Sequence, residues 1–522
     1  MRRLYGLLGM VGVLTLVGAL LGYARNASIT SVFGLSGESD AYFVAVFIPT
    51  ILQGILVLGA LAPALVHVYV NYTEEGKHDD ARVTLSSIVN VAIIAISVLV
   101  LLGMLFSRPL VGAIAPGLTE ESATLATRLM YFTLPLLLFI CVASLLGPIL
   151  NTREHFLTPA LNPVVINAFT IASIIVGGKT IGITAAGAGL LAGSVAHVAL
   201  LAFLLRRKGI AYSLTLRLNH PGVRRVLKRS APVAAYMGIA SCGPLIERLL
   251  ASTKGEGAVS MMAIAVTLFV LPTSVFNGSL GVILYPRFVR FAAGARSELA
   301  ASMMQAARLT LVVLVPATLL IIAAREPLMR LAYGPGDVSP HDITTGGGVL
   351  AVYVLAMSAV GMTQLLQKGI FAGDDFVTPL KVEMLTIGVY AALALALSSW
   401  WSVVGLALAR ACHHIINTLV TFWMVRHVRE VPSLRNLSVF ALRPLLAGAV
   451  AAGFYVVTYA AASRAHPSPS YVLTVAEQGM LLLASGGVYL IAASLLRIEE
   501  VRALWRFAPA TPRQPAITQE AA

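Results

Sequence analysis

Arg25 and Asp40 stand fifteen positions apart between two long apolar runs, in a chain where only 11% of the residues are charged. A guanidinium group binds phosphate or carboxylate through two parallel hydrogen bonds, and a nearby carboxylate can compete for it. The two side chains therefore pair with each other, or Arg25 takes an anionic ligand while Asp40 holds or releases it.

Other charged residues also interrupt apolar stretches. Glu247 and Arg248 are neighbours, Lys368 ends one run, and Arg410 lies within another. A charge at the centre of a bilayer costs about 2.5–3.5 kcal/mol, so such residues usually face a cavity or a partner. Lys368, Arg248 and Arg410 are predicted to bind an anion, and Glu247 is a candidate for ion coupling. Alternatively, Arg410 forms a structural pair with Glu247 or Glu383.

Several other residues have simpler explanations. Lys381 and Arg443 lie near the ends of apolar runs, where long side chains reach back to the interface. His413 and His414 are neighbours and do not have the i,i+4 spacing of helical metal ligands, so no metal site is expected. The sequence contains no nucleotide-binding or triad pattern in a large loop, so neither enzymatic activity nor a cofactor is expected.

The composition is that of a polytopic membrane protein. The 522 residues are 58% hydrophobic with a mean hydropathy of +0.86, and apolar runs of about 20 residues recur along nearly the whole chain. Long runs indicate helices, because a barrel would show short alternating segments. The net charge of +14 comes from Lys and Arg at the ends of apolar runs, where they set topology, so nucleic-acid binding is not expected.

The apolar runs predict an all-α fold of about fourteen spans, the first of them retained rather than cleaved as a signal peptide. Loops assigned to the cytoplasm hold most of the 37 Lys and Arg, which places both termini in the cytoplasm. The predicted units are an N-lobe at 1–205, a basic cytoplasmic linker at 206–230 that also contacts anionic lipid, a C-lobe at 231–430, a helix pair at 431–497 and a tail at 498–522.

Matched motifs indicate an internal duplication. Pro49 and Pro63 enclose "PTILQGILVLGALAP", and Pro272 and Pro286 enclose "PTSVFNGSLGVILYP". "FLTP" and "FVTP" recur in the same order at nearly the same offset of about 220 residues. Six spans per copy give both lobes the same orientation, as in transporters with parallel repeats, and the four prolines mark candidate hinges.

With these residues in place, the chain resembles the MviN/MurJ family of flippases for lipid-linked peptidoglycan precursors, within the multidrug/oligosaccharidyl-lipid/polysaccharide exporter superfamily. "GYARNASITSVFGLSGESDAYFVAVFIPTIL" is similar to the family's first-span signature. The stretch from "IAPGLTEES" to "NPVVIN" is similar to its span-four region, and "LLQKGIFAGDDFVTPLKV" to a motif of the second lobe.

The resemblance implies two six-helix lobes in a V shape and a terminal helix pair that forms a groove for the lipid tail. It also implies a cationic central cavity for the diphosphate and sugar. Arg25 and Asp40 match family positions, and Lys368 stands where an arginine is usual. Two family arginines are replaced by Gln53 and Thr267, which removes two positive charges from the expected diphosphate site.

The sequence thus predicts a lipid II flippase of the bacterial cytoplasmic membrane that works by alternating access, coupled to an ion gradient or to the membrane potential. Membrane lipids and cell-wall synthesis proteins are the expected partners. The alternatives are a flippase for another polyprenyl-linked glycan, a drug or cation antiporter, and a non-transporting scaffold. The glycan, the coupling ion and the oligomeric state do not follow from the sequence.

Overall fold

The computed structural model describes residues 2–505, except 56–60, 153–154, 156, 211, 293–295, 337, 372–374, 376, 427–433 and 466–469. Within these residues every regular element is a helix, which confirms the all-α prediction. Ten described helices are long and apolar enough to cross a membrane. The total of fourteen spans stays a prediction.

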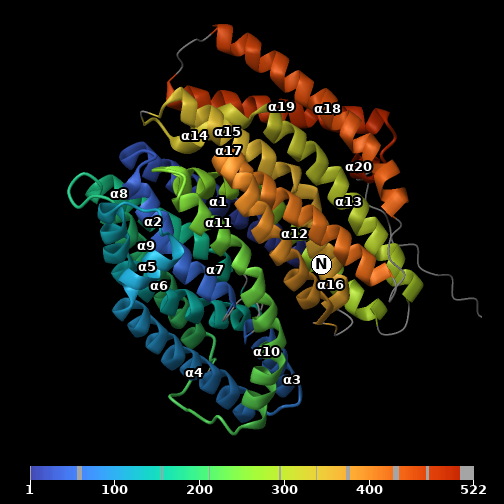
Figure 1. The fold of residues 1–522 in the computed structure, drawn as a ribbon. Coiled ribbons are helices and arrows are strands. Elements are labelled where there is room, and N and C mark those ends of the chain that lie inside the picture. The colour runs from blue at the N-terminus through green and yellow to red at the C-terminus, as the bar shows by residue number, and fades with distance from the viewer. Residues whose placement is uncertain are drawn as a thin grey trace, which may run out of the picture.

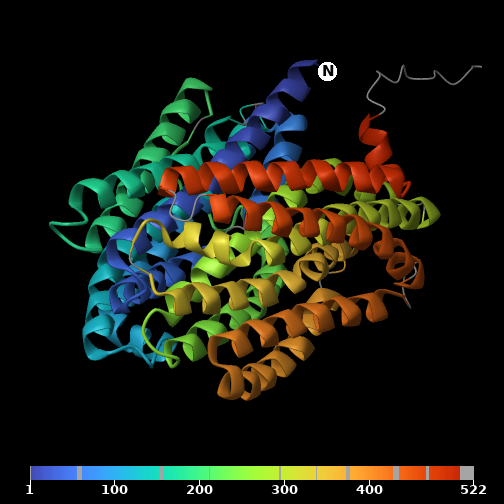
Figure 2. The same ribbon diagram turned by 90° about the horizontal axis from the view of Figure 1, so that it is seen from above.

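Two bundles lie side by side (Figures 1 and 2). The first contains α1 (Arg2–Phe33), α2 (Gly37–Gln53), α3 (Ala62–Glu74), α4 (His78–Leu105), α5 (Ser107–Ile114), α6 (Glu120–Asn151), α7 (Leu157–Ala160), α8 (Asn162–Gly177) and α9 (Thr184–Arg207). The second contains α10 (Pro221–Ala240), α11 (Cys242–Ser252), α12 (Ala258–Ala292), α13 (Arg296–Ala323), α14 (Arg325–Tyr333), α15 (Pro340–Leu355), α16 (Met357–Phe371) and α17 (Val377–Arg426).

Helix α17 is two helices joined at a sharp turn. Trp401 and Ser402 have non-helical backbone angles, and Ser402 has a φ of 51°. The turn brings the segment that follows it back along the segment before it, so residues about 30 positions apart on α17 face each other. This return places Glu383 beside His413 and Asn417.

The C-terminal helices α18 (Leu434–Ala465), α19 (Tyr471–Leu495) and α20 (Glu499–Trp505) lie along the outer side of the second bundle (Figures 1 and 2). A small apolar cluster joins them to α13 through Val312, Ala447 and Ala493. The hydroxyl group of Tyr489 also donates a hydrogen bond to the carbonyl oxygen of Val312, at 2.5 Å. The predicted helix pair is therefore packed on the second lobe. Its role as a groove for the lipid tail stays a prediction.

The two matched prolines of the first copy lie in two separate helices, whereas those of the second copy lie in one helix. In the first, α2 ends at Gln53 and α3 begins at Ala62, with Pro63 in its first turn. In the second, α12 continues through both Pro272 and Pro286, and the side chain of Pro286 lies outside the described residues. Residues 56–60 between α2 and α3 lie outside the described residues, and the role of the four prolines as hinges stays a prediction. A proline removes one backbone hydrogen bond but does not end a membrane helix held by its neighbours. Helix α12 packs against α13, α15 and α16.

An additional break divides the segment that starts the second lobe. Helix α10 ends at Ala240, and α11 starts at Cys242 after a turn at Ser241. Pro244 explains this break, because a proline lacks the amide hydrogen for the helical bond to residue i−4, here Ala240, and its ring clashes with that carbonyl group. Sequence reasoning placed no hinge here.

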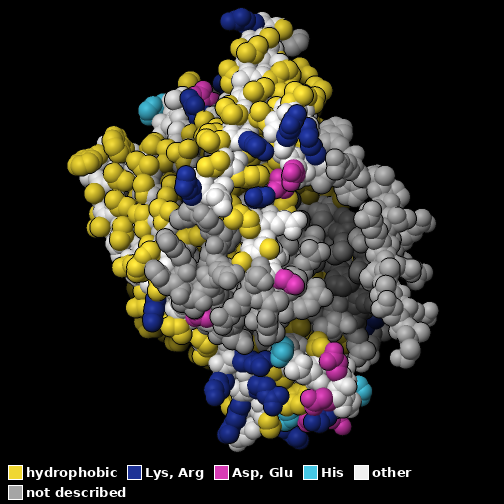
Figure 3. Space-filling view, turned by 90° about the vertical axis from the view of Figure 1, so that its right-hand side faces the viewer, with side chains coloured by type: hydrophobic (Ala, Val, Ile, Leu, Met, Phe, Trp, Pro, Cys, Tyr) yellow, Lys and Arg dark blue, Asp and Glu magenta, His cyan; other side chains and the backbone are white. Residues whose placement is uncertain are grey.

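The linker between the lobes is docked on α4. The side-chain amide of Asn90 donates hydrogen bonds to the carbonyl oxygens of Ser213 and Thr215, at 3.1 and 2.9 Å. The backbone amide of Arg217 donates to the hydroxyl group of Ser87 at 3.2 Å. Lys and Arg side chains gather at the end of the molecule where α3, α4 and α10 lie (Figure 3), as expected for the basic linker region.

Replacing Asn90 with alanine should release the linker from α4. The substitution removes three hydrogen bonds, because Asn90 also accepts one from the hydroxyl group of Tyr212, and each contributes about 0.5–1.5 kcal/mol. We expect trypsin to cleave at Arg217 several-fold faster in the variant, measured by limited proteolysis of the protein in nanodiscs. Asn71→Ala is the matched control, because Asn71 contacts His67 within its own helix. Equal cleavage rates in the two variants would contradict the docking role.

Candidate functional site

The structure divides the predicted site residues into three groups. Asp40 and Arg248 lie where the two lobes meet near the loops at 34–36 and 253–257. Arg25 lies within the first lobe. Lys368 and Arg410 belong to the second lobe and line a cavity between its helices and the start of α3. The expectation that all five share one cavity is therefore wrong for this conformation.

Asp40 caps a helix of the other lobe. Its buried carboxylate accepts hydrogen bonds from the backbone amides of Gly257 and Ser260, at 2.8 and 2.7 Å. The hydroxyl group of Ser260 donates a third at 2.5 Å. The free amides at the start of a helix favour a negative charge, and Asp40 supplies it to α12. The predicted pairing of Asp40 with Arg25 is wrong, because these bonds occupy the carboxylate and no ion pair joins the two residues.

Arg248 supports the same contact. Its guanidinium group donates to the carbonyl oxygen of Val259 at 3.2 Å and lies over the ring of Phe47, 4.9 Å from its centroid. The positive charge also interacts favourably with the Asp40 carboxylate. We call the contact of Asp40, Arg248, Gly257 and Ser260 the closed end.

Arg25 reaches an asparagine of its own lobe rather than the cavity. One terminal nitrogen of its guanidinium group donates to the side-chain oxygen of Asn167 on α8 at 3.2 Å, and two other nitrogens donate to Asn26 at 3.2 and 2.9 Å. Asn26 then donates to Thr267 on α12 at 3.0 Å. Arg25 is therefore connected to the second lobe through one residue, Asn26.

Gln53 and Thr267, which replace two family arginines, are both hydrogen-bonded. The amide of Gln53 donates to the hydroxyl group of Ser144 on α6 at 3.1 Å, and Thr267 accepts from Asn26. Neutral polar contacts therefore occupy both positions. Asn26 and Asn167 were missed by the sequence reasoning, although an asparagine in an apolar helix is itself a signal of a polar contact.

The cavity has a volume of about 720 Å³ and lies between the start of α3 and the helices α10, α16 and α17. Its charged and polar lining includes Lys368, Arg410, Glu383, His413 and Asn417. Lys368 and Arg410 supply positive charge to this lining, which suits a ligand with negative charge. Lys368 is half-buried, so its ammonium group is shielded only partly from water.

Arg410 pairs with Glu247. Their closest side-chain atoms are 3.9 Å apart, and both side chains are largely buried. The guanidinium group also lies over the ring of Tyr390. Gly243 permits this approach, because a β-carbon there would lie only 2.0 Å from a terminal nitrogen of Arg410. Arg410 therefore forms the structural pair with Glu247 that the sequence offered as an alternative to ligand binding.

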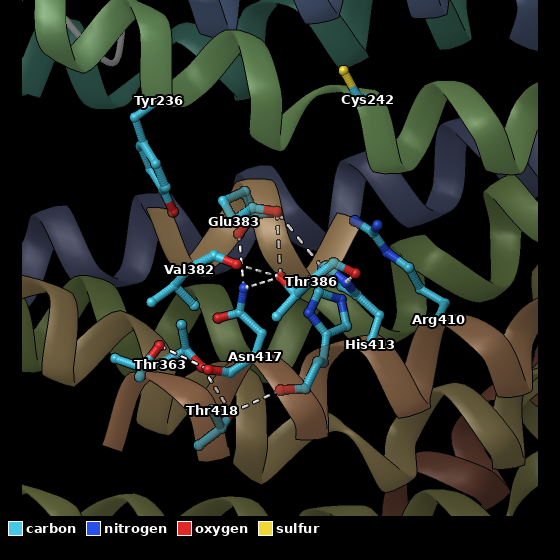
Figure 4. A network of polar contacts seen from close by, with 12 residues as sticks. Tyr236, Cys242, Thr363, Val382, Glu383, Thr386, Arg410, His413, Asn417 and Thr418 are labelled. Atoms are coloured by element: carbon cyan, nitrogen blue, oxygen red, sulfur yellow. Dashed lines mark hydrogen bonds and ion pairs between the residues drawn. The ribbon is translucent and has the colours of Figure 1, made fainter. Parts of the chain in front are cut away.

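A second polar group occupies the same cavity wall (Figure 4). Glu383 is 7% exposed and His413 is 2% exposed. One carboxylate oxygen of Glu383 lies 3.6 Å from the Nε2 atom of His413, and the other accepts from the amide of Asn417 at 2.8 Å. Sequence reasoning noted Glu383 and His413 separately and missed Asn417.

Two lobes joined at one end by Asp40 and a polar cavity between helices are features of two-lobed membrane transporters. A family model described as lipid II flippase MurJ matches residues 29–476. The chain belongs to this family, and it is accordingly a multi-pass membrane transporter of a bacterial family and not an enzyme.

Individual relatives and structures agree. The lipid II flippase MurJ of Burkholderia cenocepacia is 29% identical over 399 residues, which cover 73% of this chain and 76% of that protein. A probable lipid II flippase MurJ of Rhizobium meliloti is 27% identical and covers 92% of both chains. The fold is similar to a lipid II flippase MurJ in an inward closed conformation, with a TM-score of 0.76, 22% identity and coverage of 95% of this chain and 99% of that one.

The fold is also shared with a more distant transporter. An inward-facing multidrug resistance transporter of the MATE family has a TM-score of 0.68 at 13% identity, and covers 81% of this chain and 95% of its own. The flippase family matches this chain in sequence over residues 29–476, whereas the drug transporter shares the fold at only 13% identity, which favours a flippase over a drug antiporter.

Proposed function

We propose that this chain moves lipid II from the inner to the outer leaflet of the bacterial cytoplasmic membrane, with both termini in the cytoplasm. The cavity carries the proposal. It lies between the start of α3 and three helices of the second lobe and is lined by Lys368 and Arg410, while Asp40 joins the two lobes at the closed end. In this proposal the cavity faces the side of the membrane where the substrate is made.

In this proposal the diphosphate of lipid II binds near Lys368 and Arg410. Each charge-assisted hydrogen bond to a phosphate contributes about 1.5–3 kcal/mol. The polyprenyl tail stays in the bilayer beside α18 and α19. Arg25 acts through Asn26 and Thr267, so that it influences how the lobes separate rather than the cavity itself.

Transport against a gradient requires an energy source, and we propose coupling to an ion gradient or to the membrane potential. The potential supplies about 2.3 kcal/mol per charge per 100 mV. Glu247 is a weak candidate for the coupling group, because it is already paired with Arg410. Cell-wall synthesis proteins are the proposed partners, since they consume the flipped precursor.

Rescue of a bacterium depleted of its own lipid II flippase tests the function, with lipid II accessibility at the outer leaflet as the readout. Growth with restored outer-leaflet lipid II is the expected result. Failure despite normal insertion into the membrane would instead favour another polyprenyl-linked glycan, which the neutral residues Gln53 and Thr267 would then explain.

Lys368→Ala should reduce this rescue by at least tenfold while leaving insertion unchanged. The substitution removes one of the two cations of the cavity, and one charged hydrogen bond corresponds to about a tenfold or larger change in affinity. Lys381→Ala is the matched control, because Lys381 is an exposed lysine of α17 outside the cavity lining. Equal rescue by both variants would remove Lys368 from the site.

A further inference from the structure

The buried pair of Glu383 and His413 has a hydrogen-bond arrangement that fixes where one ring proton lies. The Nδ1 atom of His413 is 3.2 Å from the carbonyl oxygen of Thr386. A carbonyl oxygen can only accept, so Nδ1 carries the hydrogen of this bond. The other ring nitrogen, Nε2, therefore faces the carboxylate of Glu383 at 3.6 Å.

The pair can hold one additional proton in two ways that satisfy this geometry. Either Nε2 is protonated and the imidazolium faces the Glu383 carboxylate, or the ring is neutral and the carboxylic acid carries the proton. Without that proton, a buried carboxylate would face the lone pair of a ring nitrogen, which is costly in a poorly solvated site. Asn417 donates to the second carboxylate oxygen and keeps the acid oriented.

The pair also has access to the cavity, because Glu383, His413 and Asn417 are among its lining residues (Figure 4). A proton lost from the pair leaves one more negative charge in the cavity wall. A proton retained there neutralises the Glu383 carboxylate, so the cavity wall is less negative. A ligand with negative charge and the proton therefore favour each other's binding.

The surrounding ionisable groups come from every helix packed against α17. They are Tyr236 on α10, Glu247 on α11, Tyr353 on α15, Lys368 on α16, and Tyr390, Arg410 and His414 on α17 itself. Residues 258–274 of α12 have no ionisable side chain; the Phe269 ring in this stretch stacks on His414. Glu247 is paired with Arg410, which leaves His413 as the closest charge partner of Glu383.

We infer that Glu383 and His413 form a proton-binding site of the cavity, and that one proton is taken up when the diphosphate head group binds. The inference rests on the proposed function, because it requires that lipid II enters this cavity. Proton uptake from one side and release on the other would couple transport to a proton gradient. No covalent bond changes: the proton joins the pair from cavity water and returns to water.

Titration calorimetry tests this inference, with lipid II added to the full chain in nanodiscs. Measurements at one pH in two buffers of different ionisation enthalpy give the number of protons taken up per lipid II bound. At a pH where the empty site is deprotonated, we expect about one proton for the natural chain. The affinity there should fall about tenfold per pH unit as the pH rises.

Glu383→Gln and His413→Gln should each abolish the proton uptake. Two variants are used so that a loss of stability in one leaves the other to report on the site, and thermal unfolding compares each with the natural chain. His197→Gln is the matched control: His197 is also a buried histidine in contact with a backbone carbonyl oxygen, but in the first lobe. It should keep the uptake.

The outcomes separate the two proposals. Lipid II binding without proton uptake by the natural chain would overturn the inference alone. Uptake that persists in Glu383→Gln and disappears in His414→Gln would overturn it as well, because His414 would then hold the proton. Absence of any lipid II binding would contradict the proposed function and this inference with it.

Discussion

Replacement of Asp40 by alanine should open the closed end of the molecule and stop transport. The variant loses three hydrogen bonds to a buried carboxylate and leaves the amides of Gly257 and Ser260 without their acceptor. Charged hydrogen bonds are worth about 1.5–3 kcal/mol each, and a loss of about 3 kcal/mol shifts a two-state population by about 100-fold.

Distances between spin labels at Glu38→Cys and Glu256→Cys would measure this opening. Both side chains are exposed and flank the closed end, and the three native cysteines are replaced first. We expect a short distance in the parent protein and a longer, broader distribution after Asp40→Ala. Asp342→Ala is the control, since Asp342 bonds with Ser339 at the start of its own helix. Other hydrogen bonds also cross between the lobes, among them those of Tyr23 with Leu328 and of Thr30 with Ala332. An unchanged distance in Asp40→Ala would show that these suffice and would contradict the role proposed for Asp40.

Arg410→Ala should be more harmful than the simultaneous replacement of Arg410 and Glu247. The single variant leaves Glu247 as an unpaired and largely buried charge, and breaking a buried pair from one side costs about 3–5 kcal/mol. In Glu247→Gln with Arg410→Gln no charge is left, so most of the stability should return. Thermal unfolding in detergent measures this difference.

The same double variant separates the two roles proposed for Arg410. If Arg410 also binds the diphosphate, rescue of the depleted bacterium stays lost although the protein is stable again. A stable double variant that rescues growth would make Arg410 a purely structural residue. A double variant as unstable as Arg410→Ala would show that the pair does not explain the effect.

The sequence was sufficient for the fold class, because apolar runs of membrane length and matched proline motifs report directly on helices and duplication. It also identified Arg410 with Glu247 as an alternative pair. The sequence alone did not predict which distant segments contact each other. Nothing local indicates that the carboxylate of Asp40 meets the amides of Gly257 and Ser260, because such a contact depends on how two lobes dock.

The buried cluster of Glu383, His413 and Asn417 shows a second limit. Amphipathic periodicity reveals which face of a soluble helix is buried, but a membrane helix is apolar on nearly every side. The inward direction of Glu383 could not be read from its neighbours. Only the turn at Trp401 and Ser402, which folds α17 back on itself, brings these three side chains together.

The break at Ser241 divides one pass of the chain between the two lobes. Helix α10 lies against α3 and α4 of the first lobe as well as α17, whereas α11 lies mainly against α17 and α12 and contacts the first lobe only through α5. The start of α10 is fastened to the first lobe by His220, which contacts Asp80 and Thr84 on α4. A rotation of one lobe against the other would move α10 and α11 in different directions. The chain would then bend at Ser241, between the two helices.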